Sequence, residues 1–286
     1  MSQLNLTIKP AQVEIVLQPN SSYVQAYDIT NNSTETILLS TSISPWIPAD
    51  NLGTVSYLDD SENTPLTFSL SNSDLKLNQD FLINPGQKRQ LVLKINNPSS
   101  EEKDHYLTFF ITQKPINTSL SSHQNLAKIG SHLLISTTKQ KTLTSKLEVS
   151  KLTLKPNIKD VFIPLKINGE VFNNGDHYSQ INGQITVYKN NQVYWQQNLF
   201  PYTVTAQNSR LLQCLNSQNE VTTCQIKAPL WPGRYQATVK LNGDSSKEEY
   251  SFHFFIFPYS IIIIIIFLFS LLTFLLRKKQ TTSSSH

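Results

Sequence analysis

Two cysteines, Cys214 and Cys224, are the residues whose type and spacing most directly predict chemistry in this chain. They flank a polar stretch, LNSQNEVTT, that is typical of a hairpin tip. A disulfide between them would close a short loop and add roughly 2–3 kcal/mol of stability on the loop-entropy model. The alternative is two free thiols in a cytosolic protein. We expect the disulfide, because the membrane topology argued below places these residues on an oxidising side.

Residues that could form a catalytic or metal site are sparse. The sequence has no Gly-x-Ser-x-Gly elbow, no His-Glu-x-x-His helix and no glycine-rich phosphate loop. Asp104 and His105 are adjacent, but neighbours on a strand point to opposite faces, so we expect a surface histidine rather than a catalytic pair. Asp59, Asp60 and Glu62 could bind Ca²⁺ weakly, although a solvated turn is the simpler interpretation. We therefore predict a protein that is not an enzyme and has no metal site and no cofactor.

The tryptophans are candidates for stacking on a ligand. Trp46 is flanked by two prolines, which predicts a strand end or a bulge. Its ring either plugs the first core or serves as an exposed contact for a ligand such as a sugar, and we retain it as the candidate ligand contact. Trp195 is expected in the core or opposite Tyr188 on a neighbouring strand. Trp231 precedes a Pro-Gly turn and is expected to cap the second core.

The C-terminal segment predicts where these residues are displayed. Residues 259–276 carry no charge and include six consecutive isoleucines. A helix of this length spans about 27 Å, close to the roughly 30 Å of a hydrocarbon core. Arg277, Lys278 and Lys279 follow at once and act as a membrane stop signal, which marks the cytoplasmic side. We expect a single-pass plasma-membrane protein with extracellular N-terminal domains, a cytoplasmic C-terminus and lipid around the helix.

This topology requires an export signal. The first ten residues of the sequence contain no apolar core of the kind a signal peptide has. We expect that the signal was removed or that it lies upstream of Met1. The alternative is a tail-anchored protein whose domains lie in the cytosol.

The charge of the chain excludes one class of partner. The formal net charge is +4, and three of these charges belong to Arg277, Lys278 and Lys279. The remainder is nearly neutral and shows no basic cluster of the kind that binds phosphate backbones. We predict no nucleic-acid partner.

The elements that would position these residues are strands. Before residue 257 the apolar residues recur with period two, and Pro, Asn, Ser and Asp punctuate them at short intervals. This pattern predicts an all-β chain of two tandem immunoglobulin-like or fibronectin-III-like β-sandwiches followed by one transmembrane helix. The predicted parts are the first sandwich, a linker, the second sandwich, the transmembrane helix and a cytoplasmic tail, over residues 1–140, 141–145, 146–256, 257–276 and 277–286.

The second sandwich shows the clearest local patterns. Residues 233–241 alternate, with a predicted core face of Tyr235, Ala237, Val239 and Leu241. Asn190 and Asn191 are predicted at the apex of a tight hairpin, since asparagine tolerates a positive φ. The last strand contains Phe252, Phe254 and Phe255. We expect these rings to pack in the sandwich, with contact to lipid headgroups as the alternative.

The strand and turn motifs of the first domain resemble those of a bacterial family. A strand ends in Ile29-Thr-Asn-Asn-Ser33, a later turn is Ile83-Asn-Pro-Gly86, and the strand Tyr106-Leu-Thr-Phe-Phe-Ile111 follows. This is similar to the N-terminal sandwich of the WxL-interacting proteins of Gram-positive and related bacteria, and more distantly to the first domain of pilus chaperones. The resemblance implies a cell-surface protein with tandem sandwiches and a C-terminal helix. It also implies peptidoglycan binding by the first domain and a surface-protein partner for the second, with no binding residue assigned.

Two functions follow as expectations. The main one is a membrane-anchored extracytoplasmic binding or adhesion protein that recognises cell-wall glycan or a surface protein partner. The alternative is a chaperone-like assembly factor that accepts a client strand on an open sheet edge, expected on the first domain.

Overall fold

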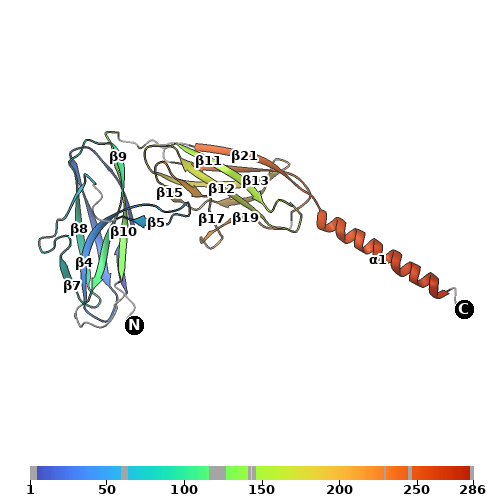
Figure 1. The fold of residues 1–286 in the computed structure, drawn as a ribbon, viewed down its shortest axis with the longest axis horizontal. Coiled ribbons are helices and arrows are strands. Elements are labelled where there is room, and N and C mark those ends of the chain that lie inside the picture. Colours follow the sequence, from blue (N-terminus) through green and yellow to red (C-terminus); the bar gives the residue numbers. More distant parts are fainter. Residues whose placement is uncertain are drawn as a thin grey trace. The chain divides into compact units, whose positions relative to one another are not determined.

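A computed structural model describes residues 5–58, 64–115, 127–140, 143, 146–228, 230–243 and 247–283. The chain folds into β-strands followed by one C-terminal helix, α1 (Tyr259–Ser283) (Figure 1). The prediction of an all-β chain with one C-terminal apolar helix is therefore confirmed. The residues divide into two compact units. The first comprises 1–145, 173–179 and 205–208, and the second comprises 146–172, 180–204 and 209–286. Of the predicted linker, only Leu143 lies within the described residues.

The first unit is a sandwich of two sheets. One has the strand order β1-β3-β8-β6, which are Leu6–Lys9, Ser21–Asn31, Lys88–Asn97 and Thr67–Leu70. The other has the order β2-β10-β9-β4-β5, which are Gln12–Leu17, Lys128–Thr137, Lys103–Lys114, Ile37–Pro48 and Val55–Tyr57, with β7 (Asp80–Ile83) paired to β4. Apolar residues of both sheets form one core, in which the rings of Tyr27 and Phe109 lie 4.9 Å apart.

One edge of the first unit is covered by its own chain. β2 pairs in parallel with β10, so that Gln12–Leu17 lies opposite His132–Thr137. This pairing satisfies the outer backbone groups of β10 over that stretch. The open edge that the sequence placed on the first domain is therefore not at this stretch of β10.

The second unit is also a sandwich of two sheets. One contains β11, β12, β16 and β19, which are Leu147–Lys155, Leu165–Asn173, Ser209–Leu211 and Cys224–Ile226. The other has the order β14-β13-β20-β21, which are Gln192–Asn198, Ser179–Lys189, Gly233–Asn242 and Lys247–Ile256, with β15 (Tyr202–Val204) paired to β13. A short hairpin joins β17 (Cys214–Leu215) to β18 (Val221–Thr222).

Local sequence patterns account for much of this unit. The four residues predicted on the core face of β20 are each at most 1% exposed: Tyr235, Ala237, Val239 and Leu241. Asn190 and Asn191 form the β13–β14 turn with φ values of 51° and 62°, as predicted. Not every polar side chain on the other face of β20 is exposed to solvent. Thr238 is only 2% exposed, and its hydroxyl lies 2.9 Å from that of Ser251 on β21.

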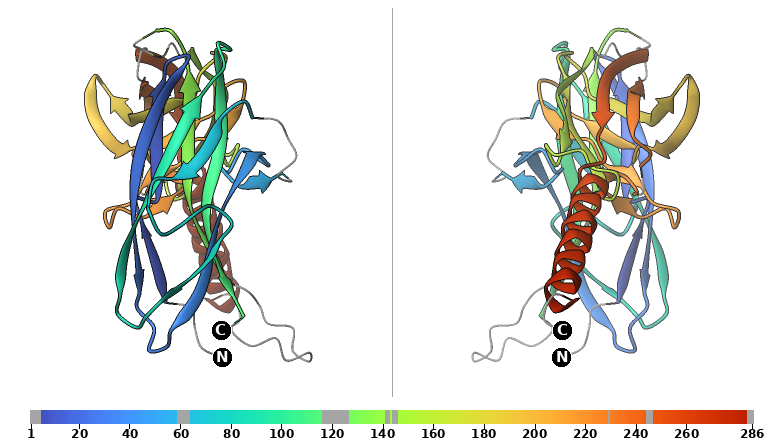
Figure 2. Two further views of the ribbon diagram at one scale, coloured as in Figure 1. Left: turned by 90° about the vertical axis from the view of Figure 1, so that its left-hand side faces the viewer. Right: turned by 90° about the vertical axis from the view of Figure 1, so that its right-hand side faces the viewer.

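Two residues separate the end of β21 from the start of α1, which runs without a break (Figure 2). Its window Tyr259–Leu276 has a mean hydropathy of 2.8, and none of it is buried in the protein. The helix is therefore long and apolar enough to cross a membrane. It continues to Ser283, so residues 277–283, which the sequence assigned to a tail, are helical.

Candidate functional site

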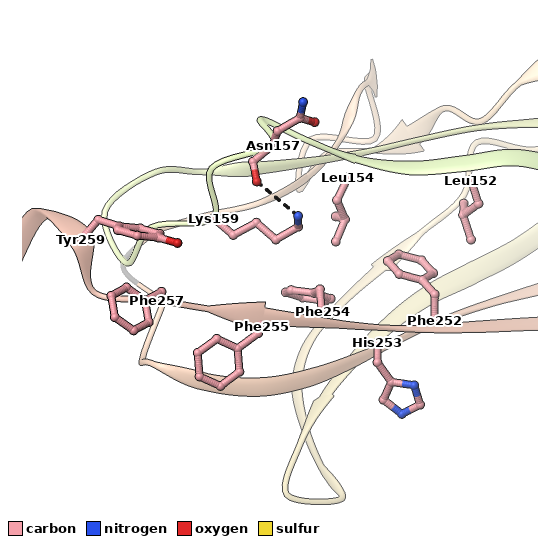
Figure 3. A pocket seen from close by; sticks show the side chains of 10 residues that line it. All are labelled: Leu152, Leu154, Asn157, Lys159, Phe252, His253, Phe254, Phe255, Phe257 and Tyr259. Atoms are coloured by element: carbon pink, nitrogen blue, oxygen red, sulfur yellow. Dashed lines mark hydrogen bonds between the residues drawn. The ribbon is translucent and has the colours of Figure 1, made fainter.

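Two edge strands of the second unit border an open groove. β11 is the last strand of one sheet and β21 is the last strand of the other. The groove beside them holds about 510 Å³. It is lined mainly by aromatic and aliphatic side chains (Figure 3), namely Leu152, Leu154, Asn157, Lys159, Phe252, His253, Phe254, Phe255, Phe257 and Tyr259.

The floor of the groove is apolar because both strands turn alternate side chains inward. Leu154 on β11 faces Phe254 on β21, whereas His253 and Phe255 point to the opposite side of β21 (Figure 3). Phe254 is 7% exposed, and its ring stacks on that of Tyr235 at 5.3 Å. Burial raises the pKa of Tyr235 to about 12, and its hydroxyl donates a hydrogen bond to the Trp231 carbonyl at 2.7 Å. The wall of the groove is therefore a fixed part of the core.

The outer edge of β21 carries free backbone groups. β21 pairs with β20 along its whole length without a register shift. The amide of Phe257, directly after the strand, donates instead to the Lys159 carbonyl at 3.0 Å, on the side away from β20. Backbone groups alternate sides along a strand, so those of Phe255, His253 and Ser251 also point to the outer side. No described strand pairs with them there.

The sequence of β21 protects only the first three of the ten residues of this strand. Its first residues, Lys247, Glu248 and Glu249, are charged, and charges discourage pairing by another chain. Residues 250–256 contain no Asp, Glu, Lys or Arg. An uncharged edge of this kind is a template for an added strand.

A second polar cluster fixes the start of α1 to the sandwich. Asp160 is 1% exposed and lies in the loop between β11 and β12. Its carboxylate accepts hydrogen bonds from the Ser260 amide at 2.8 Å, the Ser260 hydroxyl at 2.7 Å and the Phe162 amide at 3.1 Å. The first turn of a helix has unpaired amide groups, and a carboxylate there also faces the positive end of the helix dipole. Asp160 thus caps α1 from a distance of 100 residues in sequence.

Two opposing effects act on the pKa of Asp160. Burial acts to raise it, whereas the hydrogen bonds from the Ser260 and Phe162 amides and from the Ser260 hydroxyl lower it. The hydrogen bonds prevail, so the pKa of Asp160 lies below its ordinary value. The cap is therefore a carboxylate at neutral pH.

The predicted site residues lie in separate places. Cys214 and Cys224 form a disulfide with their sulfur atoms 2.10 Å apart, buried in the second core. Trp46 is buried, but it lies in a small cluster with Leu134 and Tyr178 rather than in the first core. It is 8% exposed, and its indole N–H donates to the Leu107 carbonyl at 3.0 Å. Its ring stacks on Tyr106 and is not displayed for a ligand.

Three expectations about single side chains were wrong. Phe255 does not pack in the sandwich, because it is 57% exposed. Trp231 does not cap the second core, because its ring is 71% exposed and Leu230 fills the buried position beside it. His105 is not on the surface either. It is 8% exposed, and burial lowers its pKa. Asp104, as expected, does not pair with it and accepts instead from the Tyr106 hydroxyl at 2.8 Å.

The remaining predicted residues lie at or beyond the limits of the described chain. Arg277, Lys278 and Lys279 belong to α1, but their side chains lie outside the described residues. Asp59, Asp60 and Glu62 also lie outside them. Within the described part of the chain, no three His, Cys, Asp or Glu residues form a group that could hold a metal ion.

No family model and no curated protein matches the chain. Among solved structures, the chain is similar to the class 5 fimbriae chaperone CfaA, with 10% identity, TM-score 0.42 and coverage of 89% of this chain and 100% of that one. It is also similar to the E. coli chaperone DraB, with 13% identity, TM-score 0.41 and coverage of 86% and 98%. TM-scores below 0.5 do not establish a shared fold, so no property is transferred from these structures.

Proposed function

We propose that this protein is a membrane-tethered, extracytoplasmic binding protein whose second sandwich accepts an extended segment of a protein partner. The observation that carries the proposal is the unpaired outer edge of β21 beside the groove of about 510 Å³. Strand addition to an exposed edge is a common mode of peptide recognition, in which the backbone supplies affinity and alternate side chains supply specificity. The two sandwiches, of immunoglobulin-like type in this proposal, serve as the scaffold and have no catalytic role.

The groove and the edge suit one occupant together. A strand paired with Ser251, His253 and Phe255 would turn every second side chain toward Leu154 and Phe254 on the groove floor. A partner segment with alternating apolar residues would therefore bury these residues while it pairs its backbone. This arrangement agrees with the client-strand alternative of the sequence, although on the second unit.

The cell-wall glycan alternative has less support in this structure. The sequence offered Trp46 as the ring that would stack on a sugar, and Trp46 is buried. The proposed topology places the sandwiches outside the cell and the three cations after residue 276 inside it, in line with the positive-inside rule. The disulfide between Cys214 and Cys224 suits that side of the membrane.

The Ser251→Pro variant tests the proposal. The amide of Ser251 faces away from β20, so proline removes a donor from the free edge without removing a bond of the sheet. Ser251→Ala is the matched control, because it removes the hydroxyl contact with Thr238 but keeps the amide. The probe is a fluorescent peptide in which valine and threonine alternate, titrated onto the full chain in lipid nanodiscs.

We expect the peptide to bind the natural chain and Ser251→Ala equally. Ser251→Pro should weaken binding by about 5- to 150-fold, since a partner carbonyl loses its donor at a cost of about 1–3 kcal/mol. The same peptide should not bind when it is N-methylated at the alternate residues whose amides would donate to the carbonyls of the β21 edge. Equal binding by Ser251→Pro and Ser251→Ala would refute strand addition. Strand addition would also be refuted if lipid occupied the groove and the peptide did not displace it.

A further inference from the structure

Three large apolar side chains are exposed at the end of the second sandwich where α1 begins. They are Ile158 and Phe162 in one loop, at 63% and 55% exposure, and Trp231 in another, at 71%. Single exposed apolar residues are ordinary, but three at one end of a unit mark an interaction surface. We call residues 155–163 together with 227–228 and 230–234 the helix-proximal rim.

Hydrogen bonds hold the rim at the start of the helix. The Leu230 amide donates to the Val161 carbonyl at 2.7 Å, which joins the two loops. The carboxylate of Asp160, between Ile158 and Phe162 in the chain, accepts from the amide of Ser260 in the first turn of α1. Phe257 and Tyr259, 39% and 48% exposed, continue the apolar surface from the sandwich into the helix. The rim is therefore adjacent to the first residues of the apolar window.

The helix-proximal rim carries a net positive charge. Its sequence contains four cations, Lys155, Lys159, Lys227 and Arg234. Its one acid is Asp160, which is buried and bound to Ser260. Lysine, arginine and exposed aromatic rings beside a transmembrane helix form the combination that suits a bilayer interface with anionic lipid.

We infer that the helix-proximal rim is a bilayer-docking surface, which rests on the proposed membrane span of α1. Ile158, Phe162 and Trp231 enter the interfacial layer, and the four cations face anionic headgroups. The occupant of this surface is lipid rather than a protein partner. The second sandwich is thereby held against the membrane by its own loops as well as by the helix.

Site-specific labelling of the full chain in liposomes tests this inference. The two native cysteines are paired, so an introduced cysteine is the accessible thiol for an NBD label. Phe162→Cys reports on the rim and Phe267→Cys, 65% exposed within the apolar window, reports on the helix. Asn242→Cys is the matched aqueous control, because it is exposed at the opposite end of β20 from Gly233. Ile158→Cys repeats the rim measurement at a second position.

We expect blue-shifted emission and quenching by spin-labelled lipid at residues 158, 162 and 267, and neither at residue 242. Quenching at 162 should increase when phosphatidylglycerol is added to phosphatidylcholine vesicles. A lipid signal at 267 with an aqueous signal at 158 and 162 would overturn the docking inference while the membrane tether stands. An aqueous signal at 267 would overturn both. Quenching at 162 that is independent of anionic lipid would refute the role of the cations.

Discussion

Removal of the Asp160 carboxylate should free the start of α1 from the sandwich. The carboxylate accepts three hydrogen bonds, two from Ser260 and one from Phe162. Hydrogen bonds to a charged group contribute about 1.5–3 kcal/mol each, so three at the low end give about 4.5 kcal/mol. Asp160→Ala should therefore raise the equilibrium constant for local opening at this site by about two thousandfold. Asp160→Asn keeps one acceptor oxygen and should lose about half of that free energy.

Amide hydrogen exchange measures this opening directly in the full chain in nanodiscs. The Ser260 amide should lose its protection in Asp160→Ala and lose part of it in Asp160→Asn, while amides in the middle of β20 keep theirs. The Ser260→Ala variant is the companion measurement, since it removes the hydroxyl bond and leaves the amide bond in place. If the Ser260 amide exchanged in Asp160→Ala within about threefold of the natural rate, the capping argument would fail.

The same cap has a defined pH dependence. The pKa of Asp160 is lower in the folded protein than its unfolded value of about 3.9. The unfolded state therefore binds the proton first, and the contribution to stability is complete above pH 3.9 or so. It is lost as the pH falls from there through the folded pKa. Protection of Ser260, corrected for intrinsic exchange, should decline in that acidic window in the natural chain but not in Asp160→Asn.

Two further outcomes concern the predicted site residues. Replacement of both Cys214 and Cys224 by serine should lower the free energy of unfolding of the second unit by about 2–3 kcal/mol, because the loop between them is short. Chemical denaturation gives the value, and an unchanged midpoint would contradict it. Trp46→Phe should lower the stability of the first unit by about 1–3 kcal/mol, since the buried Leu107 carbonyl loses its donor. If Trp46→Phe instead left stability intact and abolished glycan binding, Trp46 would be a ligand contact.

Local signals in the sequence predicted much of the fold. The alternation of residues 233–241 identified a core strand because each face of a strand lies in a different environment. Asn190 and Asn191 identified a turn because few residues tolerate a positive φ. The run of isoleucines identified α1 by length and hydropathy alone. The immunoglobulin-like type of the two sandwiches and the resemblance to WxL-interacting proteins remain predictions.

The candidate site was harder to predict because it depends on long-range pairing. The strand β12 begins only at Leu165, and the loop before it carries Asp160 to the helix. Nothing near Asp160 in sequence indicates a partner at Ser260. The free edge of β21 was not predicted from the sequence either. Whether a strand lies at the edge of a sheet depends on the strand order, which the pattern of a single strand does not reveal. The three charges at the start of β21, against none in residues 250–256, were the available signal.

The two-residue junction of β21 with α1 sets a limit on reach. A strand rises about 3.3 Å per residue, so β21 and the two junction residues together extend at most about 40 Å from the point where the chain leaves the helix. For a chain held in a bilayer by α1, a segment added to this edge must come within that height of the lipid. A partner segment held farther from the bilayer could reach the edge only through a long flexible linker. A chain that emerges at the membrane surface is already within this distance.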